Sequence, residues 1–201
     1  MASWSAQDRF VHLQQQCYRI DLETMPTLNI YTDNLQIISR WSYEVSSGKI
    51  VCIVPDRNAL SQFRIYDKEM SVKDIEPFSL PTDVNIIEED AIDAALELKA
   101  KGLNPVIHNF ANGYYPCGLY EEGGTGFEED ICRRTTLSLS LQKAHNHYPL
   151  DLNFGGIYSS ACVFRNKENE GYCLLENPSM LHFISVAALN LRSNRHHNNI
   201  L

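Results

Sequence analysis

One stretch of the chain decides the predicted fold, and it reads His108-Asn-Phe-Ala-Asn-Gly-Tyr-Tyr-Pro-Cys-Gly-Leu-Tyr-Glu-Glu-Gly-Gly-Thr-Gly-Phe-Glu-Glu-Asp-Ile-Cys-Arg-Arg-Thr-Thr-Leu137. Its beginning belongs to an apolar run, Leu103–Phe110, that is typical of a buried strand, and its end opens a helical pattern, Phe127–Ala144. Between them, the segment Asn112–Gly126 carries glycines at positions 113, 118, 123, 124 and 126. In open α/β sheets, ligands bind at the loops that follow the strands. We therefore expect a ligand site in this glycine loop.

The residues around this stretch complete an α/β pattern. Asp83–Ile87 predicts a strand, and Asp90–Lys101 predicts a helix that ends at Gly102 before the run from Leu103. A strand, a helix and a strand in this order form a βαβ unit, so we expect a mixed, mostly parallel sheet with helices on both faces. A further helix is expected over Ser5–Tyr18, and further strands are expected over Lys49–Val54, Gln62–Tyr66, Gly156–Arg165, Tyr172–Glu176 and His182–Leu189.

The composition limits the class of protein. The 201 residues are 44% hydrophobic and 21% charged, which suits one compact globular domain. Within it, residues 1–80 are expected to form an N-terminal extension of a helix and short strands, packed on a core of residues 81–201. The 17 basic and 25 acidic residues give a net charge of -8, which argues against binding to a long nucleic-acid duplex.

The cysteines and the hydropathy pattern bear on the compartment. The six cysteines are scattered without a Cys-x-x-Cys pair, so free thiols are expected. No segment reaches the ~20 apolar residues of a membrane span, and the N-terminus lacks the pattern of a signal peptide. These features predict a protein of the cytoplasm or the nucleus that is neither secreted nor bound to a membrane.

Two adjacent glutamates, Glu128 and Glu129, follow the last glycine of the loop. In a helix their side chains point about 100° apart, so both can face one site, one to hold a substrate and one to transfer a proton. The helix N-terminus favours their ionised forms, whereas burial and mutual repulsion favour protonation. Cleavage of a glycosidic bond needs a carboxylic acid beside the leaving oxygen. Acidic residues are also common in the first turn of ordinary helices, so the residues alone leave a catalytic pair and a structural helix start both open.

Other side chains carry weaker chemical signals. The histidines of His145-Asn-His147 and His196-His197 have no cysteine or carboxylate partner at metal-ligand spacing, and neither a metal nor a cofactor is expected. Cys117 with His108 or His145 is an alternative nucleophilic pair, although a lone cysteine is more often an inert packed thiol. The pair Arg133-Arg134 can contact a diphosphate or bind neighbouring acidic side chains.

Several short motifs, in their order and spacing, resemble the microbial-type poly(ADP-ribose) glycohydrolase family. The signature of that family is a strand ending in Asn-Phe-Ala, then Pro-Gly-Gly-Gly, Gln-Glu-Glu, Cys-Arg and Ser/Thr-Leu. The resemblance covers roughly half of the chain, from about Asp83 to Asn190, and implies a macrodomain-like three-layer α/β sandwich. The matching segments are Asn109-Phe-Ala111, Pro116-Cys-Gly-Leu119, Phe127-Glu-Glu129, Cys132-Arg133 and Thr136-Leu137, followed by Gly155–Ser160, Val163-Phe-Arg165 and Phe183–Asn190.

The resemblance also implies roles for single residues. Glu129 would be the general acid that protonates the departing ribosyl oxygen, and Glu128 would hold hydroxyl groups of the ribose under attack. Ligand contacts are implied for four further residues: Asp90 at the adenine amino group, Asn112 at the distal ribose, Gly118 in the loop over the reacting ribose, and Phe164 as the aromatic residue of the Val-Phe-Arg motif.

The sequence departs from the family signature in three places. Cys117 and Leu119 replace two of the three glycines, and a side chain at either position costs about 1 kcal/mol or more where φ is positive. Phe127 replaces the glutamine, whose hydrogen bonds it cannot make, although its ring is able to stack on a base or a ribose. The chain is also expected to end before the last strand, glycine loop and helix of the family, which wrap the diphosphate.

Three hypotheses about function follow. The first is a metal-free hydrolase that cleaves the O-glycosidic linkage of poly- or mono-ADP-ribose, with free ADP-ribose or an ADP-ribosylated protein as its partner. The alternative is a module that binds ADP-ribose without cleaving it. The third is an interaction protein that keeps the fold but has lost the pocket.

Overall fold

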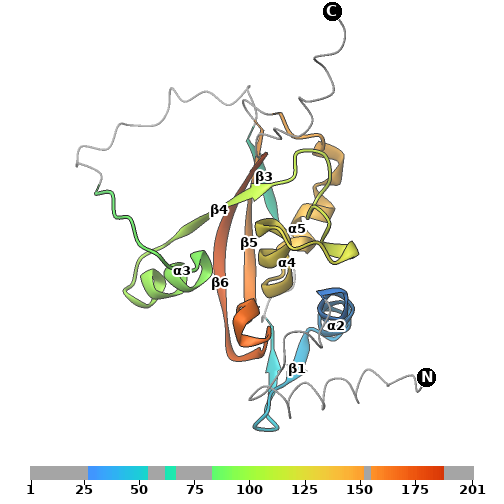
Figure 1. Cartoon of the computed structure of the whole chain (residues 1–201), viewed down its shortest axis with the longest axis vertical. Coiled ribbons are helices and arrows are strands. Elements are labelled where there is room, and N and C mark those ends of the chain that lie inside the picture. The colour runs from blue at the N-terminus through green and yellow to red at the C-terminus, as the bar shows by residue number, and fades with distance from the viewer. Residues whose placement is uncertain (1–26, 54–61, 67–82, 152–154, 188–201) are drawn as a thin grey trace, which may run out of the picture.

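The computed structural model describes residues 27–53, 62–66, 83–151 and 155–187. The α/β fold class expected from the sequence is confirmed, whereas the helix expected over Ser5–Tyr18 lies outside the described residues. The elements follow one another as in Figure 1: α2 (Thr27–Arg40), β1 (Ser42–Glu44), β2 (Ile50–Cys52), β3 (Phe63–Tyr66), α3 (Ala91–Ala100), β4 (Val106–Ala111), η4 (Tyr120–Glu122), α4 (Phe127–Arg134), α5 (Leu137–Lys143), η5 (His145–His147), β5 (Gly156–Arg165), η6 (Glu168–Glu170) and β6 (Leu174–Ala187).

Four strands form the main sheet in the order β3-β5-β6-β4. β4 pairs in parallel with β6, whereas β5 pairs antiparallel with both β6 and β3. The sheet is mixed, as expected, but the expectation that it is mostly parallel is wrong for these strands. The connection from β5 to β6 contains only the short η6 turn, which is too short for a parallel crossover, so the chain returns antiparallel. Two strands were expected over Tyr172–Glu176 and His182–Leu189, and the described residues of both, from Leu174 to Ala187, lie in a single strand, β6.

The segment before β4 confirms the predicted helix but not the predicted strand. The side chain of Asp90 accepts the N–H groups of the first turn of α3, and Gly102, with φ of +83°, follows the end of the helix. Residues 83–89 form no strand, and Val84 and Ile86 are 82% and 97% exposed. A short apolar run makes a strand only where neighbours pair with it and bury it, and no described residue does so here.

The helical pattern Phe127–Ala144 forms two helices rather than one. α4 ends at Arg134, and Thr135 is extended, with φ of -135° and ψ of 171°. Its Oγ1 donates to the carbonyl of Ile131 and accepts the N–H of Leu137, so one side chain satisfies backbone groups on both sides of the break. Thr135 also forms a bridge to Val163 of β5. The break allows α5 to turn and pack on β5.

α2 has no counterpart among the helices expected from the sequence. Its Asn34 donates to the Tyr120 hydroxyl (2.9 Å) and to the Arg133 carbonyl (2.8 Å), and it accepts from Nε of Arg165 (2.6 Å). Asp33 forms an ion pair with the same arginine, which is 2% exposed. Polar contacts therefore hold α2 against the loop, α4 and β5.

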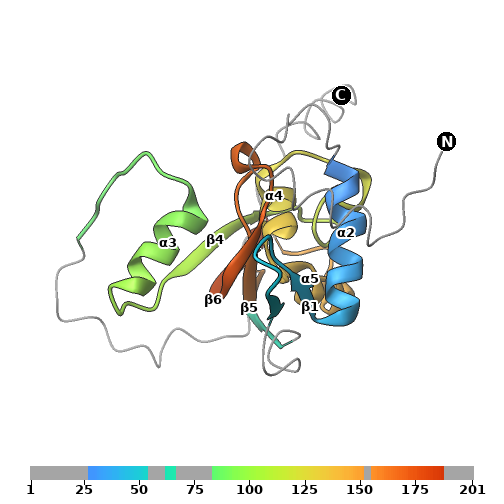
Figure 2. The same cartoon turned by 90° about the horizontal axis from the view of Figure 1, so that it is seen from below.

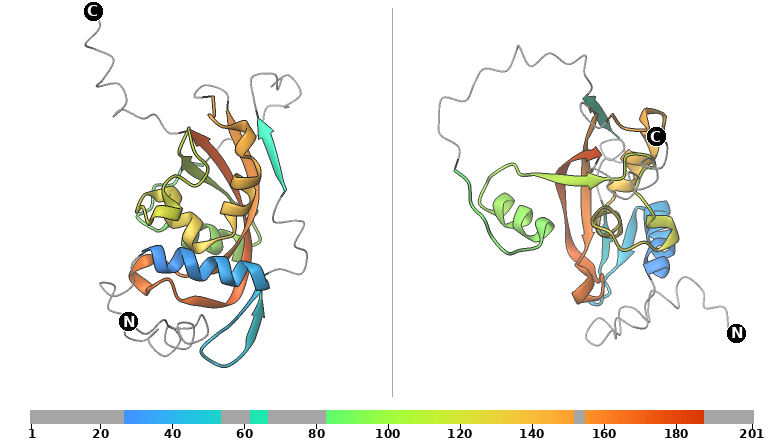
Figure 3. Two further views of the ribbon diagram at one scale, coloured as in Figure 1. Left: turned by 90° about the vertical axis from the view of Figure 1, so that its right-hand side faces the viewer. Right: turned by 45° about the horizontal axis from the view of Figure 1, so that its top comes forward.

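Two buried apolar clusters join these layers. The larger cluster packs the sheet against α3, α4 and α5, and the smaller one packs the β1–β2 hairpin on β5. Figure 2 shows α3 on one side of β5 and β6, and α2, α4 and α5 on the opposite side. Figure 3 shows β3 at the outer edge of the sheet beside β5, so a strand from within residues 1–80 belongs to the same sheet as β4, β5 and β6, and the division at residue 80 stays a prediction. Within the described ranges, no helix has the length and apolar character needed to cross a membrane.

Candidate active site

β4 leads directly into the site. Its burial alternates, so Asn109 and Ala111 point into the protein, and the strand ends before Asn112. The side-chain oxygen of Asn112 accepts the N–H groups of Tyr114 (2.8 Å) and Tyr115 (3.1 Å). This Asx-turn starts the loop that leads to α4. The predicted order of strand, glycine loop and helix is therefore confirmed.

Glu128 lies beneath the loop and is 3% exposed. Its Oε2 accepts the N–H of Asn112 (2.8 Å), and its Oε1 accepts from Nδ2 of Asn109 (3.3 Å). Burial raises the pKa of Glu128 to about 7, although both of these hydrogen bonds lower it and the charge of Glu129 raises it. Near neutral pH, this carboxyl group therefore exists in both protonation states.

Glu129 contacts the loop instead of the sheet. Its Oε1 accepts the N–H of Leu119 (2.9 Å). Two glycines leave room for its carboxylate: a Cβ on Gly118 would lie 2.5 Å from Oε1, and a Cβ on Gly126 would overlap Oε2. Gly118 also has φ of +54°, a conformation that glycine adopts without strain. Position 118 thus needs glycine both for its backbone and for the space beside Glu129.

The two residues that replace loop glycines differ in their backbone. Cys117 has φ of +66° and is 1% exposed, so its side chain strains the backbone by about 1 kcal/mol or more. Leu119 has φ of -99°, which any residue adopts, and it is 51% exposed. Arg133, 1% exposed, donates to the carbonyl of Gly124 and fastens the far end of the loop to α4.

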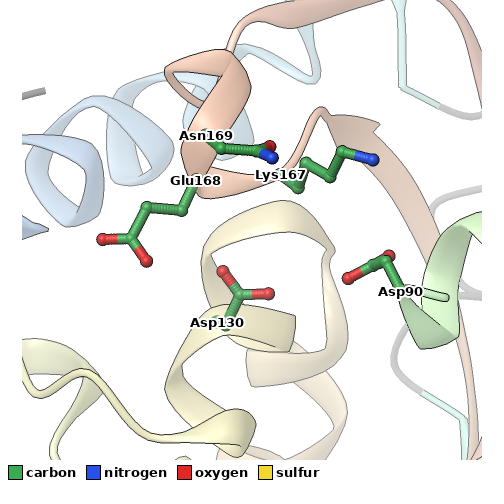
Figure 4. Close-up of a pocket in the computed structure, with 5 residues that line it drawn as sticks. All are labelled: Asp90, Asp130, Lys167, Glu168 and Asn169. Atoms are coloured by element: carbon green, nitrogen blue, oxygen red, sulfur yellow. The ribbon is translucent and has the colours of Figure 1, made fainter. Parts of the chain in front are cut away.

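Asp90 lies at a pocket of about 460 Å³ between the start of α3, α4 and the η6 segment. Figure 4 shows Asp90 and Asp130 facing Lys167, Glu168 and Asn169 across this pocket. Burial alone would raise the pKa of Asp90, but hydrogen bonds from a guanidinium group and from backbone N–H groups outweigh burial and lower it. The carboxylate is therefore ionised at neutral pH and able to accept a hydrogen bond from a ligand.

The guanidinium beside Asp90 belongs to Arg134, whose side chain is 1% exposed. It contacts three carboxylates, those of Asp90 (2.8 Å), Asp93 (3.2 Å) and Asp130 (3.4 Å). The expected pairing of one of the two arginines with a nearby acidic residue is confirmed by Asp130. The pairing with α3 was not expected, because it joins residues more than forty positions apart in the sequence.

The structure brings together some of the predicted site residues and separates others. Glu128, Glu129, Gly118 and Asn112 meet where the loop enters α4. Phe164 is completely buried in the smaller cluster, beside the ring of Tyr43, so its expected contact with a ligand is wrong. The reason is that the β1–β2 hairpin covers this side of β5.

Phe127 and Cys117 have surroundings of their own. The ring of Phe127 is edge-on to that of Phe110 at 5.4 Å, and the residue is 41% exposed, so stacking on a ligand stays a prediction. The thiol of Cys117 is buried and lies 4.0 Å from the carbonyl of Ser138. Among the described residues, no group of three or more histidine, cysteine or acidic side chains is arranged to hold a metal ion.

Comparison with known proteins decides the family. The family model described as the microbial-type PARG catalytic domain matches residues 32–167, which is more than half of the chain. The chain belongs to this family. The match includes Asp90, the glycine loop and both glutamates. The resemblance stated from the sequence is confirmed, and so is the predicted enzyme class, a glycosidase-type hydrolase acting on ADP-ribose. None of the curated proteins compared with the chain matches it.

Solved structures of bacterial poly(ADP-ribose) glycohydrolases share the fold of this PARG-family chain. The enzyme from Thermomonospora curvata is 25% identical, with a TM-score of 0.73, over 87% of this chain and 68% of that chain. Its structure with the inhibitor ADP-HPD is 26% identical, with a TM-score of 0.70, over 87% and 67%. The enzyme from Deinococcus radiodurans in complex with ADP-ribose is 25% identical, with a TM-score of 0.56, over 67% and 59%.

Proposed function

We propose that the chain hydrolyses the O-glycosidic linkage of ADP-ribose, in a polymer or on a modified protein, with Glu129 as the general acid. The observation that carries this proposal is the pair of carboxylates at the start of α4, one bound to the sheet and one bound to the loop. Structures of two related enzymes, one with ADP-ribose and one with ADP-HPD, support ADP-ribose as the ligand.

The hydrogen bonds support different roles for the two glutamates. Both oxygens of Glu128 accept N–H groups of the protein, so its position is fixed, which suits a residue that holds ribose hydroxyls. Glu129 accepts one N–H group, at Oε1, and within the described part of the chain its Oε2 makes no hydrogen bond. That oxygen is available to carry a proton to the substrate.

In the proposed reaction, the bond between the anomeric carbon of the ribose and the linkage oxygen breaks. Glu129 donates its proton to the departing oxygen, and the anomeric carbon passes through an oxocarbenium-like state. A water molecule adds to that carbon and returns a proton to Glu129. The products are free ADP-ribose and the hydroxyl group of the acceptor.

The remaining ligand contacts are proposed on the same basis. Asn112 would donate its Nδ2 to the distal ribose, because its side-chain oxygen is occupied by the Asx-turn. Asp90 would accept the adenine amino group at the pocket shown in Figure 4. Gly118 would pass over the reacting ribose, where any side chain would meet Glu129.

The substitution Glu129→Gln tests the general acid. It keeps the shape of the side chain and removes the proton, so we expect release of ADP-ribose from an ADP-ribosylated protein to fall by ~10²–10⁴. Glu122→Gln is the matched control, because Glu122 is an exposed glutamate of η4 in the same loop. An unchanged rate in Glu129→Gln would remove this residue from the mechanism.

One observation favours the alternative of a module that binds ADP-ribose without cleaving it. Cys117 strains the loop, and Leu119 presents an exposed side chain where the family signature has glycine. Calorimetry with ADP-ribose, combined with a product assay, separates the two functions, because binding without turnover supports the module. A ligand at 100 times its Kd should stabilise the chain by ~2.7 kcal/mol, and the absence of any shift in Tm would contradict both functions.

We also propose that the chain works in the cytoplasm or the nucleus. Five cysteines lie in the described ranges. Three of them are buried thiols, which a reducing compartment preserves. Fractionation of cells that express the chain, with detection of the intact protein, tests this proposal.

A further inference from the structure

Beneath the site, two adjacent strands carry a buried polar pair, Asn109 of β4 and Ser185 of β6. The two residues are partners in the parallel register, and both are 0% exposed. Nδ2 of Asn109 donates to Oγ of Ser185 (3.0 Å) and to Oε1 of Glu128 (3.3 Å). A carboxamide nitrogen carries two hydrogens, so these two contacts use its whole donor capacity.

The pair gives the amide of Asn109 one preferred orientation. If the amide turned over, its oxygen would face Oε1 of Glu128, and in the ionised form of that carboxyl group two acceptors would oppose each other. In the observed orientation, Oδ1 of Asn109 is buried and has no hydrogen bond among the described residues. Burying an unpaired polar atom costs free energy, and an apolar side chain at this position would avoid that cost. The amide is therefore better explained by its contact with Glu128 than by packing.

We propose that Asn109, held by Ser185, is a positioning residue that fixes Oε1 of Glu128 to the sheet and keeps Oε2 turned toward the loop and the ligand. Two observations agree with this orientation. Oε2 accepts the N–H of Asn112 at the start of the loop. It would also lie 3.3 Å from a Cβ on Gly118. The inference rests on the proposed function, because it takes Glu128 as the residue that holds the ribose.

In the part of the chain that the structure describes, few titratable groups face Glu128, so its ionisation reports on this contact. They are Glu129 and Cys132 of α4 and Tyr148 after η5, and the backbone of Cys117 also lowers the pKa of Glu128. Burial raises the pKa of Glu128, and the hydrogen bond from Asn109 lowers it. Loss of that bond should raise the midpoint of the Glu128 titration by about one pH unit, as expected for one hydrogen bond to a charged group.

The test is a titration of the Glu128 carboxyl carbon by ¹³C NMR in the full chain, with its signal assigned by its loss in Glu128→Gln. Asn109→Leu is nearly isosteric and should raise the midpoint by about one pH unit. Ser185→Ala should raise it by less, because the amide keeps one partner. Ser159→Ala is the matched control: Ser159 is a buried serine of the same sheet, and its Oγ makes no hydrogen bond in the described ranges.

An unmoved midpoint in folded Asn109→Leu would overturn the inference. If Asn109→Leu does not fold, Ser185→Ala decides, and a midpoint no higher than that of Ser159→Ala would overturn it. The titration needs no turnover, so its outcome is separate from that of the proposed function. If the chain is inactive but the midpoint shifts in Asn109→Leu, the positioning role stands and the proposed reaction is wrong. If the chain is active but the midpoint does not move, the proposed reaction stands and the positioning role is wrong.

Discussion

Three substitutions by alanine separate backbone strain from crowding of Glu129. Gly118 combines φ of +54° with a Cβ position 2.5 Å from Oε1 of that glutamate. Gly102 has φ of +83° and nothing within 4 Å of its Cβ position. Gly126 has φ of -76°, but its Cβ position overlaps Oε2 of Glu129. Gly102→Ala therefore tests strain, Gly126→Ala tests crowding, and Gly118→Ala tests both.

The two effects have different sizes and different readouts. A left-handed alanine costs about 1–2 kcal/mol, so Gly102→Ala and Gly118→Ala should each lose that much free energy of unfolding in urea. An ordinary contact begins near 3.4 Å, so a Cβ at 2.5 Å displaces the Glu129 carboxylate by roughly 1 Å. A displacement of about 1 Å in an active site can reduce the rate about 10²-fold.

The assay is release of ADP-ribose from an ADP-ribosylated protein, at a temperature where all three variants are folded. We expect Gly118→Ala and Gly126→Ala to be slower by about 10²-fold, and Gly102→Ala to keep the rate of the unchanged chain. Equal rates for Gly118→Ala and Gly102→Ala would refute the reasoning that the loop glycines make room for Glu129.

Two further predictions concern stability. The pKa of Glu128 is about 7 in the folded chain, whereas its ordinary value is 4.5. Its contribution to the free energy of unfolding is therefore fully present below pH 4.5 and is lost as the pH rises through about 7. Glu128→Gln removes this titration, so the free energy of unfolding should fall by about 1–3 kcal/mol less between pH 5 and pH 8 in the variant than in the unchanged chain, as urea denaturation at both pH values can show. Arg134→Gln removes the cation that three partly exposed carboxylates share, of which Asp93 keeps its ion pair with Lys167, and should cost about 2–3 kcal/mol at pH 7. The lowered pKa of Asp90 means that this loss should shrink as the pH falls through the folded pKa of that residue, and an equal loss at pH 3 and pH 7 would contradict the ion-pair explanation.

The elements that the sequence predicted well are those whose signals are local. α3 has a capping aspartate at its start and a left-handed glycine after its end, and both act within a few residues. α2 is different, because Asn34 makes its hydrogen bonds with residues 86 or more positions away. No local pattern contains such contacts. The same limit explains β6, because the pairing with β5 makes one strand out of two short apolar runs.

The candidate site was predictable to the same degree. The two glutamates and Gly118 lie within one loop and the helix that follows it. Residues that are close in space are therefore also close in the sequence here. The ionisation of Glu128 depends on burial, which is set by the packing of the whole core. The error on Phe164 has the same origin, because which side of β5 is covered depends on the β1–β2 hairpin.

The shortness of α4 has a consequence for the distance between the two ends of the proposed site. The helix has 8 residues and is about 12 Å long. Glu129 stands in its first turn and Arg134, which grips Asp90, in its last, about 7.5 Å further along the axis. The helix therefore sets the distance between the proposed general acid and the residue proposed to accept the adenine amino group. Inserting one residue between Glu129 and Arg134 would lengthen the helix by about 1.5 Å and rotate one end by about 100°, so a ligand that binds both ends as proposed would lose one of the two contacts.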